Sequence, residues 1–272
     1  MQLSKRFVFV LSLTLLSCGN LYATQDQETP YEPHVGQPGK DVVWVPTPQV
    51  LVDQMLDLAQ VIKQDYVIDL GSGDGRTVIT AAKRGARAHG IEYEPGMVKL
   101  AIQNALDANV EDKATFEQVD LFEKDLSQAD VITMFLLPSI NMRLRPRLLD
   151  LRPGTRIVSN TFTMEDWEAD ETVTVTENCT SWCTALLWLV PAKVEGAWET
   201  SEEPLTLTQE FQIISGTLGD VAISEGRLRG DRISFKVRNV NYSGLVNGDA
   251  MKGTIETTPP STWNAMRKQS RN

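Results

Sequence analysis

The sequence predicts an α/β fold, in which a doubly wound and mainly parallel sheet is followed by a second, smaller all-β domain. The first observation is a strand, a glycine-rich turn, a helix and another strand in succession over residues 66–92, which is how doubly wound folds begin. The second is a change of composition after Pro191, where short alternating segments are separated by glycine turns about every 8–12 residues. That spacing is typical of a small β-barrel or β-sandwich.

The 272-residue chain has the composition of a soluble globular protein, with 42% hydrophobic and 23% charged residues. These fractions exclude a largely disordered chain and a protein with many membrane spans. The 36 acidic residues outnumber the 26 lysines and arginines, which gives a net charge of -10. This charge argues against general binding to nucleic acid, whose backbone attracts Lys and Arg, although a local basic groove stays open. An acidic protein suits a cationic partner.

Residues 1–23 have the pattern of a bacterial signal peptide. A positively charged start precedes an apolar run over residues 7–16, which is too short to span a bilayer core that needs about 20 residues. Cys18 follows in a lipobox-like context, so we expect its lipidation and attachment to the membrane. Cleavage after Ala23 and an uncleaved anchor are the alternatives. The expected location is the bacterial envelope, as a periplasmic protein or membrane-anchored lipoprotein, and the cytoplasm if the signal is misread.

The rest of the chain divides into three segments. Residues 24–41 are polar and rich in proline and glycine, as expected of a linker. An α/β domain is expected over residues 42–192 and a β-meander domain over residues 193–272. Trp198 and Trp263 lie near the two ends of the β-meander and are expected in its core rather than on a ligand.

The α/β domain is expected to open with a helix at Thr47-Pro48. Thr is a common N-cap, and Pro is common at the first helical position. The following elements are a strand at 66–70, a glycine turn at 71–75, a helix at 76–84 and a strand at 88–92. A glycine turn between a strand and a helix lets a ligand approach the backbone near the positive end of the helix.

Two interpretations compete for the glycine turn. A dinucleotide-binding turn needs G-x-G-x-x-G, but Arg76 occupies the third glycine position and Asp69 stands where an apolar residue is usual. A carboxylate buried there is costly unless it meets hydrogen-bond donors or a cation. S-adenosylmethionine (SAM) carries both an ammonium and a sulfonium group, so Asp69 favours SAM. Glu92, at the end of the second strand, is placed to accept hydrogen bonds from both ribose hydroxyls.

The chain resembles the class I SAM-dependent methyltransferases over about residues 42–191. The motifs that carry this resemblance are, in chain order, DLGSGDGR (69–76), GIE (90–92), QVDLF (118–122) and DVITMFLLP (130–138). The resemblance implies a Rossmann-like methyltransferase sheet and SAM as the cofactor. It implies cofactor contacts from Asp69, Gly71, Gly73, Glu92, Asp120 and Leu121, of which Asp120 would receive the adenine amino group.

A closer resemblance is to the mitochondrial lysine methyltransferases that act on the ATP synthase c-subunit and on the adenine nucleotide translocase. It rests on VPTP (45–48), DLGSGDGR (69–76) and GIEYEP (90–95). It implies methyl transfer to the lysine of a protein partner. It also makes Thr47 a cofactor contact, because in that family the Pro-Thr segment folds over the methionine end of SAM. The resemblance is weaker after Pro138, so the identity of the substrate does not transfer.

The acceptor channel is expected at the end of the fourth strand, with Phe135, Leu137 and Pro138 as candidate walls; plain core packing is the alternative. The strand lacks the Asn/Asp-Pro-Pro-Tyr run of methyltransferases that act on planar amides and exocyclic amines, which disfavours such acceptors. No His or Cys ends a motif, so no general base is predicted. Two other functions stay open: a catalytically silent envelope binding protein on the same fold, and a small-molecule methyltransferase. SAM is made in the cytoplasm, which conflicts with export.

The last strands of the α/β domain are expected at 155–162, 172–176 and 185–190. Cys179 and Cys183 lie in the turn of the final hairpin, where they can form a disulfide in an oxidising compartment or bind a metal. The chain has no second cysteine pair and only two histidines, His34 and His89. A structural metal site is therefore not expected.

Overall fold

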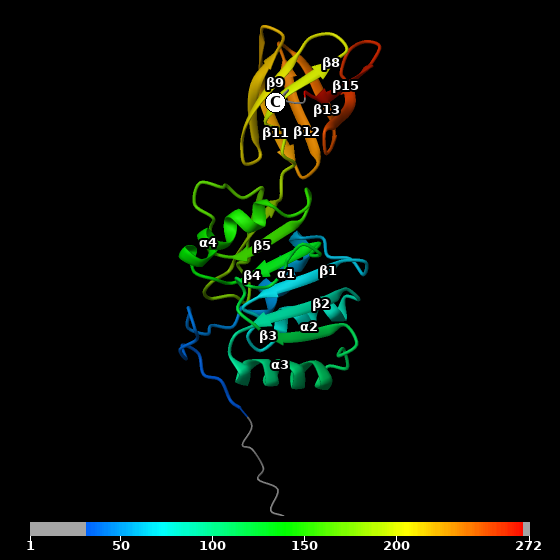
Figure 1. The fold of residues 1–272 in the computed structure, drawn as a ribbon. Coiled ribbons are helices and arrows are strands. Elements are labelled where there is room, and N and C mark those ends of the chain that lie inside the picture. Colours follow the sequence, from blue (N-terminus) through cyan, green and yellow to red (C-terminus); the bar gives the residue numbers. More distant parts are fainter. Residues whose placement is uncertain (1–30, 269–272) are drawn as a thin grey trace, which may run out of the picture. The chain divides into compact units, whose positions relative to one another are not determined.

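The computed structural model describes residues 31–268 (Figure 1). The predicted signal peptide at residues 1–23, with its lipobox-like Cys18, lies outside the described residues. No helix within the described part of the chain is both long and apolar enough to cross a membrane.

The α/β domain is built on a seven-stranded sheet in the order β3-β2-β1-β4-β5-β7-β6. Its strands are β1 (Tyr66–Leu70), β2 (Arg87–Glu92), β3 (Ala114–Gln118), β4 (Val131–Met134), β5 (Arg156–Asn160), β6 (Glu171–Thr174) and β7 (Thr184–Leu189). The first five run parallel, whereas β7 is antiparallel to both β5 and β6. The predicted Rossmann-like sheet and its closing antiparallel hairpin are therefore confirmed.

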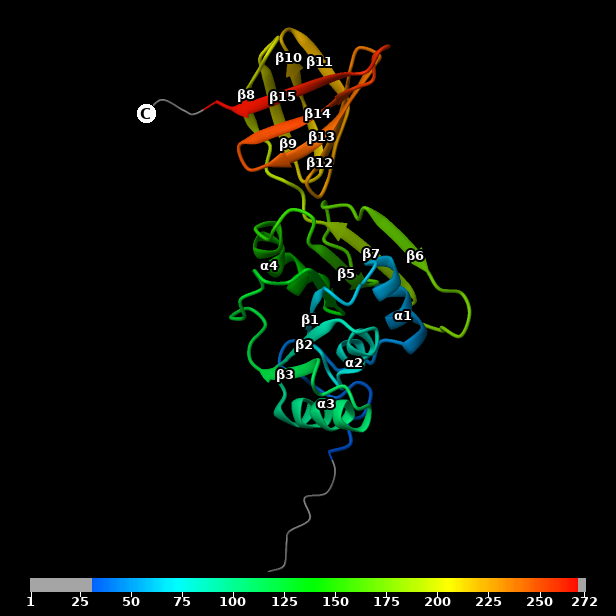
Figure 2. The same ribbon diagram turned by 90° about the vertical axis from the view of Figure 1, so that its right-hand side faces the viewer.

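Four helices cover the two faces of this sheet (Figure 2). They are α1 (Gln49–Leu58), α2 (Arg76–Lys83), α3 (Pro95–Asp107) and α4 (Pro138–Leu149). Alternation along β1 divides its side chains between two apolar clusters. Val67 packs with residues of α1, α2 and α3, whereas Ile68 and Leu70 pack with α4. The sheet is thus buried on both sides, and its accessible edge for a ligand is the one formed by the strand ends.

The start of α1 differs from the prediction by one position. Pro48 is the residue that precedes the helix, and no side chain caps the helix there. Thr47 is therefore not the N-cap. Its hydroxyl accepts a hydrogen bond from Asn160 Nδ2 at 3.3 Å, so it ties the segment before α1 to the end of β5.

The second domain is a closed, antiparallel, eight-stranded barrel. Its strands are β8 (Gly196–Thr200), β9 (Leu205–Glu210), β10 (Ile213–Leu218), β11 (Val221–Arg229), β12 (Arg232–Val237), β13 (Val240–Asn247), β14 (Ala250–Ile255) and β15 (Ser261–Arg267). Closure comes from β8, which pairs with both β9 and β15. Trp198 and Trp263 belong to the buried core of the barrel, as predicted.

The hairpin of β6 and β7 carries a disulfide in its turn. Cys179 and Cys183 are bonded, with 5.9 Å between their Cα atoms. The disulfide alternative for these residues is confirmed. Within residues 31–268 no group of three or more acidic, His or Cys side chains is arranged to hold a metal ion.

Candidate functional site

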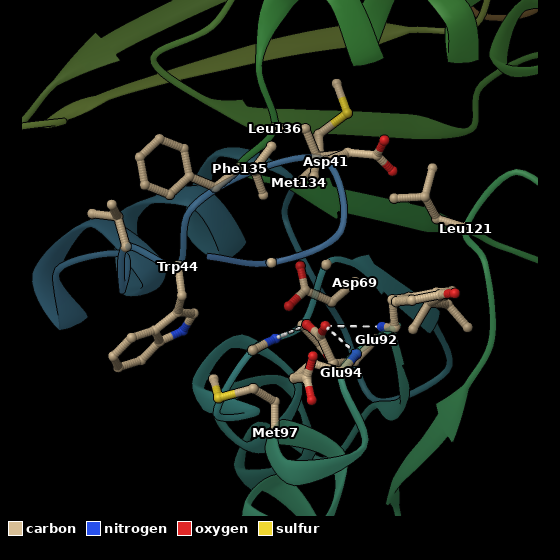
Figure 3. A pocket seen from close by; sticks show the side chains of 18 of the residues that line it. Asp41, Trp44, Asp69, Glu92, Glu94, Met97, Leu121, Met134, Phe135 and Leu136 are labelled. Atoms are coloured by element: carbon tan, nitrogen blue, oxygen red, sulfur yellow. Dashed lines mark hydrogen bonds between the residues drawn. The ribbon is translucent and has the colours of Figure 1, made fainter. Parts of the chain in front are cut away.

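A cavity of about 570 Å³ lies where β1, β2 and β4 end (Figure 3). Ligands of open α/β sheets bind at the carboxyl ends of the strands, and the volume falls in the range of small-molecule sites, about 300–1,000 Å³. All seven sequence-predicted cofactor residues line it: Thr47, Asp69, Gly71, Gly73, Glu92, Asp120 and Leu121. Phe135 and Leu137 also line the cavity, whereas Pro138 does not and instead begins α4.

Asp69 is a buried carboxylate that faces the cavity, with 6% of its surface exposed. It lies opposite Thr133 in the pairing of β1 with β4, and the Thr133 hydroxyl donates a 2.6 Å hydrogen bond to it. Burial raises the pKa of Asp69 to about 7, and the charges of Glu92 and Asp74 add to this effect. A cation bound in the cavity would favour the ionised carboxylate and offset the cost of its burial.

Glu92 is held at the end of β2 by three backbone groups (Figure 3). Its Oε2 accepts from the N–H of Gly73 at 2.9 Å, and its Oε1 accepts from the N–H groups of Tyr93 and Glu94 at 2.8 and 3.0 Å. Each carboxylate oxygen has two lone pairs. Three of these four lone pairs are taken, so the side chain is fixed in position and keeps one free lone pair, on Oε2, for a ligand hydroxyl rather than for the pair expected from the sequence.

The glycine turn lets other groups come close to its backbone. Gly71 and Gly73 have φ values of +75° and +54°, which are left-handed conformations that favour glycine. A Cβ atom on Gly73 would lie 2.7 Å from the indole nitrogen of Trp44. Next to these glycines, the buried Ser72 hydroxyl has no hydrogen-bond partner among the described residues.

The segment before α1 covers one side of the cavity. We call residues 37–47 the strap, because every residue in this range lines the cavity. The sequence assigned residues 24–41 to a linker, so the last part of that linker belongs to the site. Lys40 binds Asp120 with 2.5 Å between Nζ and Oδ2 and lies over the ring of Tyr93. The hydrogen bond from Lys40 lowers the pKa of Asp120.

Arg76 joins the glycine turn to the strap. It forms an ion pair with Asp74, with 2.6 Å between Nη2 and Oδ2, and donates from Nη1 to the carbonyl of Thr47 at 2.9 Å. Asp74, which also lines the cavity, thus positions Arg76.

The sequence predicts only Phe135 among the aromatic side chains of the cavity; Trp44, Tyr93, Phe162 and Trp182 also line it. Phe162 follows β5, and Trp182 lies in the disulfide-closed turn before β7; both line the cavity together with Phe135. Nothing local in the sequence marks Phe162. The one local feature that marks Trp182 in the sequence is its position between two closely spaced cysteines.

The arrangement suits a cationic adenosyl ligand. Asp69 offers a carboxylate whose ionised form is stabilised by a positive charge, Glu92 offers an acceptor for a ligand hydroxyl, and the glycine turn allows close approach. Asp41 and Glu94 add further negative charge to the lining, and apolar side chains make up much of the rest. The residues present therefore fit SAM.

A scan against protein families matches residues 69–171 to the ANTKMT methyltransferase domain. A protein-lysine N-methyltransferase of Saccharolobus islandicus is 40% identical over 148 residues, which are 53% of this chain and 88% of that protein. The ATP synthase c-subunit lysine N-methyltransferase of Mus musculus is 36% identical over 107 residues, which are 39% of this chain and 43% of that protein.

Among solved structures, an RNA methyltransferase from Salinibacter ruber in complex with S-adenosyl-L-homocysteine (SAH) is similar to this chain. The two share 49% identity with a TM-score of 0.52, over 55% of this chain and 96% of that one. These similarities thus extend over little more than half of the present sequence.

Proposed function

The chain belongs to the family of the ANTKMT methyltransferase domain and is a SAM-dependent methyltransferase, and on this premise we propose that its methyl acceptor is a protein lysine. The observation that carries the proposal is the 40% identity to a protein-lysine N-methyltransferase over 88% of that relative. The acidic and aromatic lining of the cavity supports it, since such a surface attracts a primary alkylammonium group.

Four residues would hold SAM along the cavity. Asp69 would accept a hydrogen bond from the amino group of the methionine moiety, and the free lone pair of Glu92 would accept one from a ribose hydroxyl. Asp120 would accept from the adenine amino group at the far end. Thr47, at the end of the strap, would contact the methionine part. Each of these side chains lines the same cavity, so all four are open to one ligand bound there.

The reaction forms one bond and breaks one. When bound, SAM supplies an electrophilic methyl group on a sulfonium centre: as the lone pair of the neutral lysine nitrogen forms the C–N bond, the C–S bond breaks and its electron pair stays on sulfur, which leaves SAH. The new N-methylammonium group then loses a proton to solvent before it can react again.

The described residues supply positioning and exclusion of water rather than a strong base. No His or Cys is found among the cavity-lining residues of the described chain. Phe135 and Leu137 provide apolar walls at the end of β4, and desolvation lowers the pKa of a lysine amine. Holding the amine in line at about 3–3.5 Å from the methyl carbon is the main contribution expected of the protein.

RNA is the competing acceptor, because the Salinibacter ruber relative is described as an RNA methyltransferase. The net charge of -10 and the acidic lining oppose the approach of a phosphate backbone. The charge of the chain therefore favours a cationic protein side chain over RNA.

The experiment offers both acceptors at once. Purified protein is incubated with SAM carrying a tritiated methyl group, together with lysine-rich proteins and total RNA in equal mass. We expect label in protein, recovered as Nε-methyl-lysine after acid hydrolysis. Glu92→Ala, which weakens the predicted cofactor site, is the background control. Label that is lost on ribonuclease treatment, or no label in either fraction, would refute lysine as the acceptor.

We also propose that the protein acts in the bacterial envelope, attached through Cys18. The Cys179–Cys183 disulfide supports this location, because disulfides persist in oxidising compartments. Fractionation of cells with palmitate labelling tests it. A labelled membrane fraction is expected, and an unlabelled, soluble cytoplasmic product would refute it.

A further inference from the structure

Three aromatic rings from distant parts of the chain meet in the cavity. Phe135 follows β4, Phe162 follows β5, and Trp182 lies in the turn between β6 and β7. The ring centroids are 5.8 Å apart for Phe135 and Phe162, 5.8 Å for Phe135 and Trp182, and 5.3 Å for Phe162 and Trp182. All three residues line the cavity that also contains Asp69 and Glu92. We call these three residues the aromatic cluster.

The fold keeps this cluster outside the buried apolar cores of the sheet domain: Trp182 is exposed, and Phe135 and Phe162 are half-buried. Trp182 is 41% exposed. Its backbone has a φ of +57°, which is uncommon for a bulky residue. The disulfide between Cys179 and Cys183 closes a short loop that contains Trp182. The carbonyl of Phe162 accepts hydrogen bonds from Ser159 Oγ at 2.7 Å and Asn141 Nδ2 at 3.3 Å. These partly exposed rings thus form an aromatic surface that lines the cavity.

The geometry suits an alkylammonium group. A cation is attracted to an aromatic face when it lies within about 6 Å of the ring centroid. Phe135 and Phe162 stack on each other and Trp182 is tilted against both, so an ammonium group would lie over the outer faces of these rings and not between them. Methyl groups on the nitrogen remove N–H donors and spread the positive charge, so an aromatic surface retains methylated lysine where hydrogen-bond acceptors would not.

We propose that Phe135, Phe162 and Trp182 form a binding site for the alkylammonium group of the acceptor, and that the Cys179–Cys183 disulfide positions Trp182 in it. The binding site rests on the proposed function in one respect, namely that the methyl acceptor is a lysine. The site retains mono- and dimethyl-lysine between turnovers, so it promotes successive methylation of one nitrogen. Trp182 is thus a specificity-determining residue, and the two cysteines are positioning residues.

The binding test uses two small probes in the presence of saturating SAH. One is Nα-acetyl-Nε-trimethyl-lysine amide, and the other is its neutral isostere with carbon in place of the quaternary nitrogen. By calorimetry we expect the wild-type protein to bind the cationic probe about tenfold more tightly than the neutral one. Equal affinities, or no binding of the cationic probe, would overturn the proposal.

Variants at Trp182 separate the aromatic character from simple apolar contact. Trp182→Phe should keep most of the preference for the cation, whereas Trp182→Leu should lose it while SAH affinity stays within about twofold. Glu177→Gln, an exposed position in the same hairpin turn, is the matched control and should behave as wild type. The double variant Cys179→Ser/Cys183→Ser should bind the cationic probe more weakly and should bind SAH as tightly as the wild type does. A Trp182→Leu protein that prefers the cation as strongly as wild type would overturn the assignment.

Turnover distinguishes this proposal from the proposed function. If the protein methylates lysine, Trp182→Leu should raise the KM for the acceptor more than it lowers kcat and should reduce the share of trimethyl-lysine. Lysine methylation with an unchanged product ratio in Trp182→Leu would overturn the aromatic site alone. Selective binding of the cationic probe without any lysine methylation would support the site and refute lysine as the methyl acceptor.

Discussion

Asp69 has the most unusual environment of any single residue in the site. Its carboxylate is buried, is paired with a neutral hydroxyl and has Glu92 and Asp74 as acidic neighbours. The folded pKa of about 7 lies well above the ordinary value of 3.8. The folded protein without ligand therefore binds this proton more tightly than the unfolded chain does. Its stability falls as the pH rises from about 4 through 7, unless a cation is bound.

The affinity for SAH should therefore depend on pH through Asp69. Below pH 7 the carboxyl group must lose its proton to bind the ligand ammonium, so affinity should rise up to about tenfold per pH unit and level off above pH 7. Calorimetry at pH 5.5, 6.5 and 8 in two buffers measures both the affinity and the proton release. The Asp69→Asn variant should bind SAH more weakly than the wild type, and its SAH affinity should not change with pH in this way. A wild-type affinity that is independent of pH, with no proton release, would contradict the role of Asp69.

Glu92 should contribute directly to cofactor affinity. Hydrogen bonds to a charged group contribute about 1.5–3 kcal/mol, so Glu92→Ala should weaken SAH binding by about 10- to 100-fold. Glu92→Gln keeps one acceptor oxygen, so its loss of SAH affinity should be smaller. The control is Glu111→Ala, at an exposed position outside the cavity. Unchanged SAH affinity in Glu92→Ala, in a sample that melts as wild type, would show that this carboxylate does not bind the ribose.

Residues of the site could be predicted where the signal is local. Asp69 and Glu92 end consecutive strands on either side of a glycine turn, and parallel strand ends meet at one sheet edge. Phe162 follows β5, whose end lies beside that of β4, but no local motif marks it. Trp182 could not be predicted, because it lies in the turn between β6 and β7, which is placed by the pairing of β7 with β5 and closed by the disulfide. Such contacts depend on segments far apart in the sequence.

Among the structural elements, the strap is the one whose role was predicted least well from the sequence. Its polar, proline-containing residues predict a linker, and their ordering depends on contacts such as Lys40 with Asp120 and Trp44 with Gly73. The helices and strands of the sheet domain follow more directly from apolar periodicity and the glycine turn. The closed barrel was predicted only as a barrel or a sandwich, because closure depends on the pairing of β8 with β15, the first and last strands of that domain.

Trp44 should make the strap important for the cofactor. Its indole faces the glycine turn and lines the cavity (Figure 3), and a large aromatic side chain contributes much contact area. We expect Trp44→Ala to weaken SAH binding about tenfold, mainly through faster dissociation, as measured by stopped-flow displacement. Trp182→Leu provides the comparison, because its effect should fall on the acceptor. Equal effects of both variants on SAH dissociation would contradict the division of the cavity into a cofactor part and an acceptor part.

At the scale of the whole molecule, the two domains have largely separate cores, joined where Phe211, between β9 and β10, stacks on Trp167 of the sheet domain. The buried cluster of the barrel contains only residues between Ala192 and Ala265, and two other clusters fill the faces of the sheet. A ligand that binds the folded state stabilises it by about 2.7 kcal/mol at 100 times its Kd. For a domain of about 150 residues this raises the melting temperature by roughly 5–10 °C.

Differential scanning calorimetry should therefore show that SAH shifts the transition of the sheet domain and leaves that of the barrel in place. Glu92→Ala, measured at the same SAH concentration, should reduce the shift. An equal shift of the whole unfolding profile would show instead that the two domains unfold as one unit.

A crystal structure with SAH and Nα-acetyl-Nε-trimethyl-lysine amide tests the central claim most directly. We expect the amino group of SAH at Asp69, a ribose hydroxyl at Glu92, and the quaternary nitrogen of the probe within about 6 Å of the ring centroids of Phe135, Phe162 and Trp182. The nitrogen should also point towards the sulfur of SAH. A probe bound elsewhere, or SAH in the cavity with its sulfur turned away from the three rings, would contradict methyl transfer to lysine at this site.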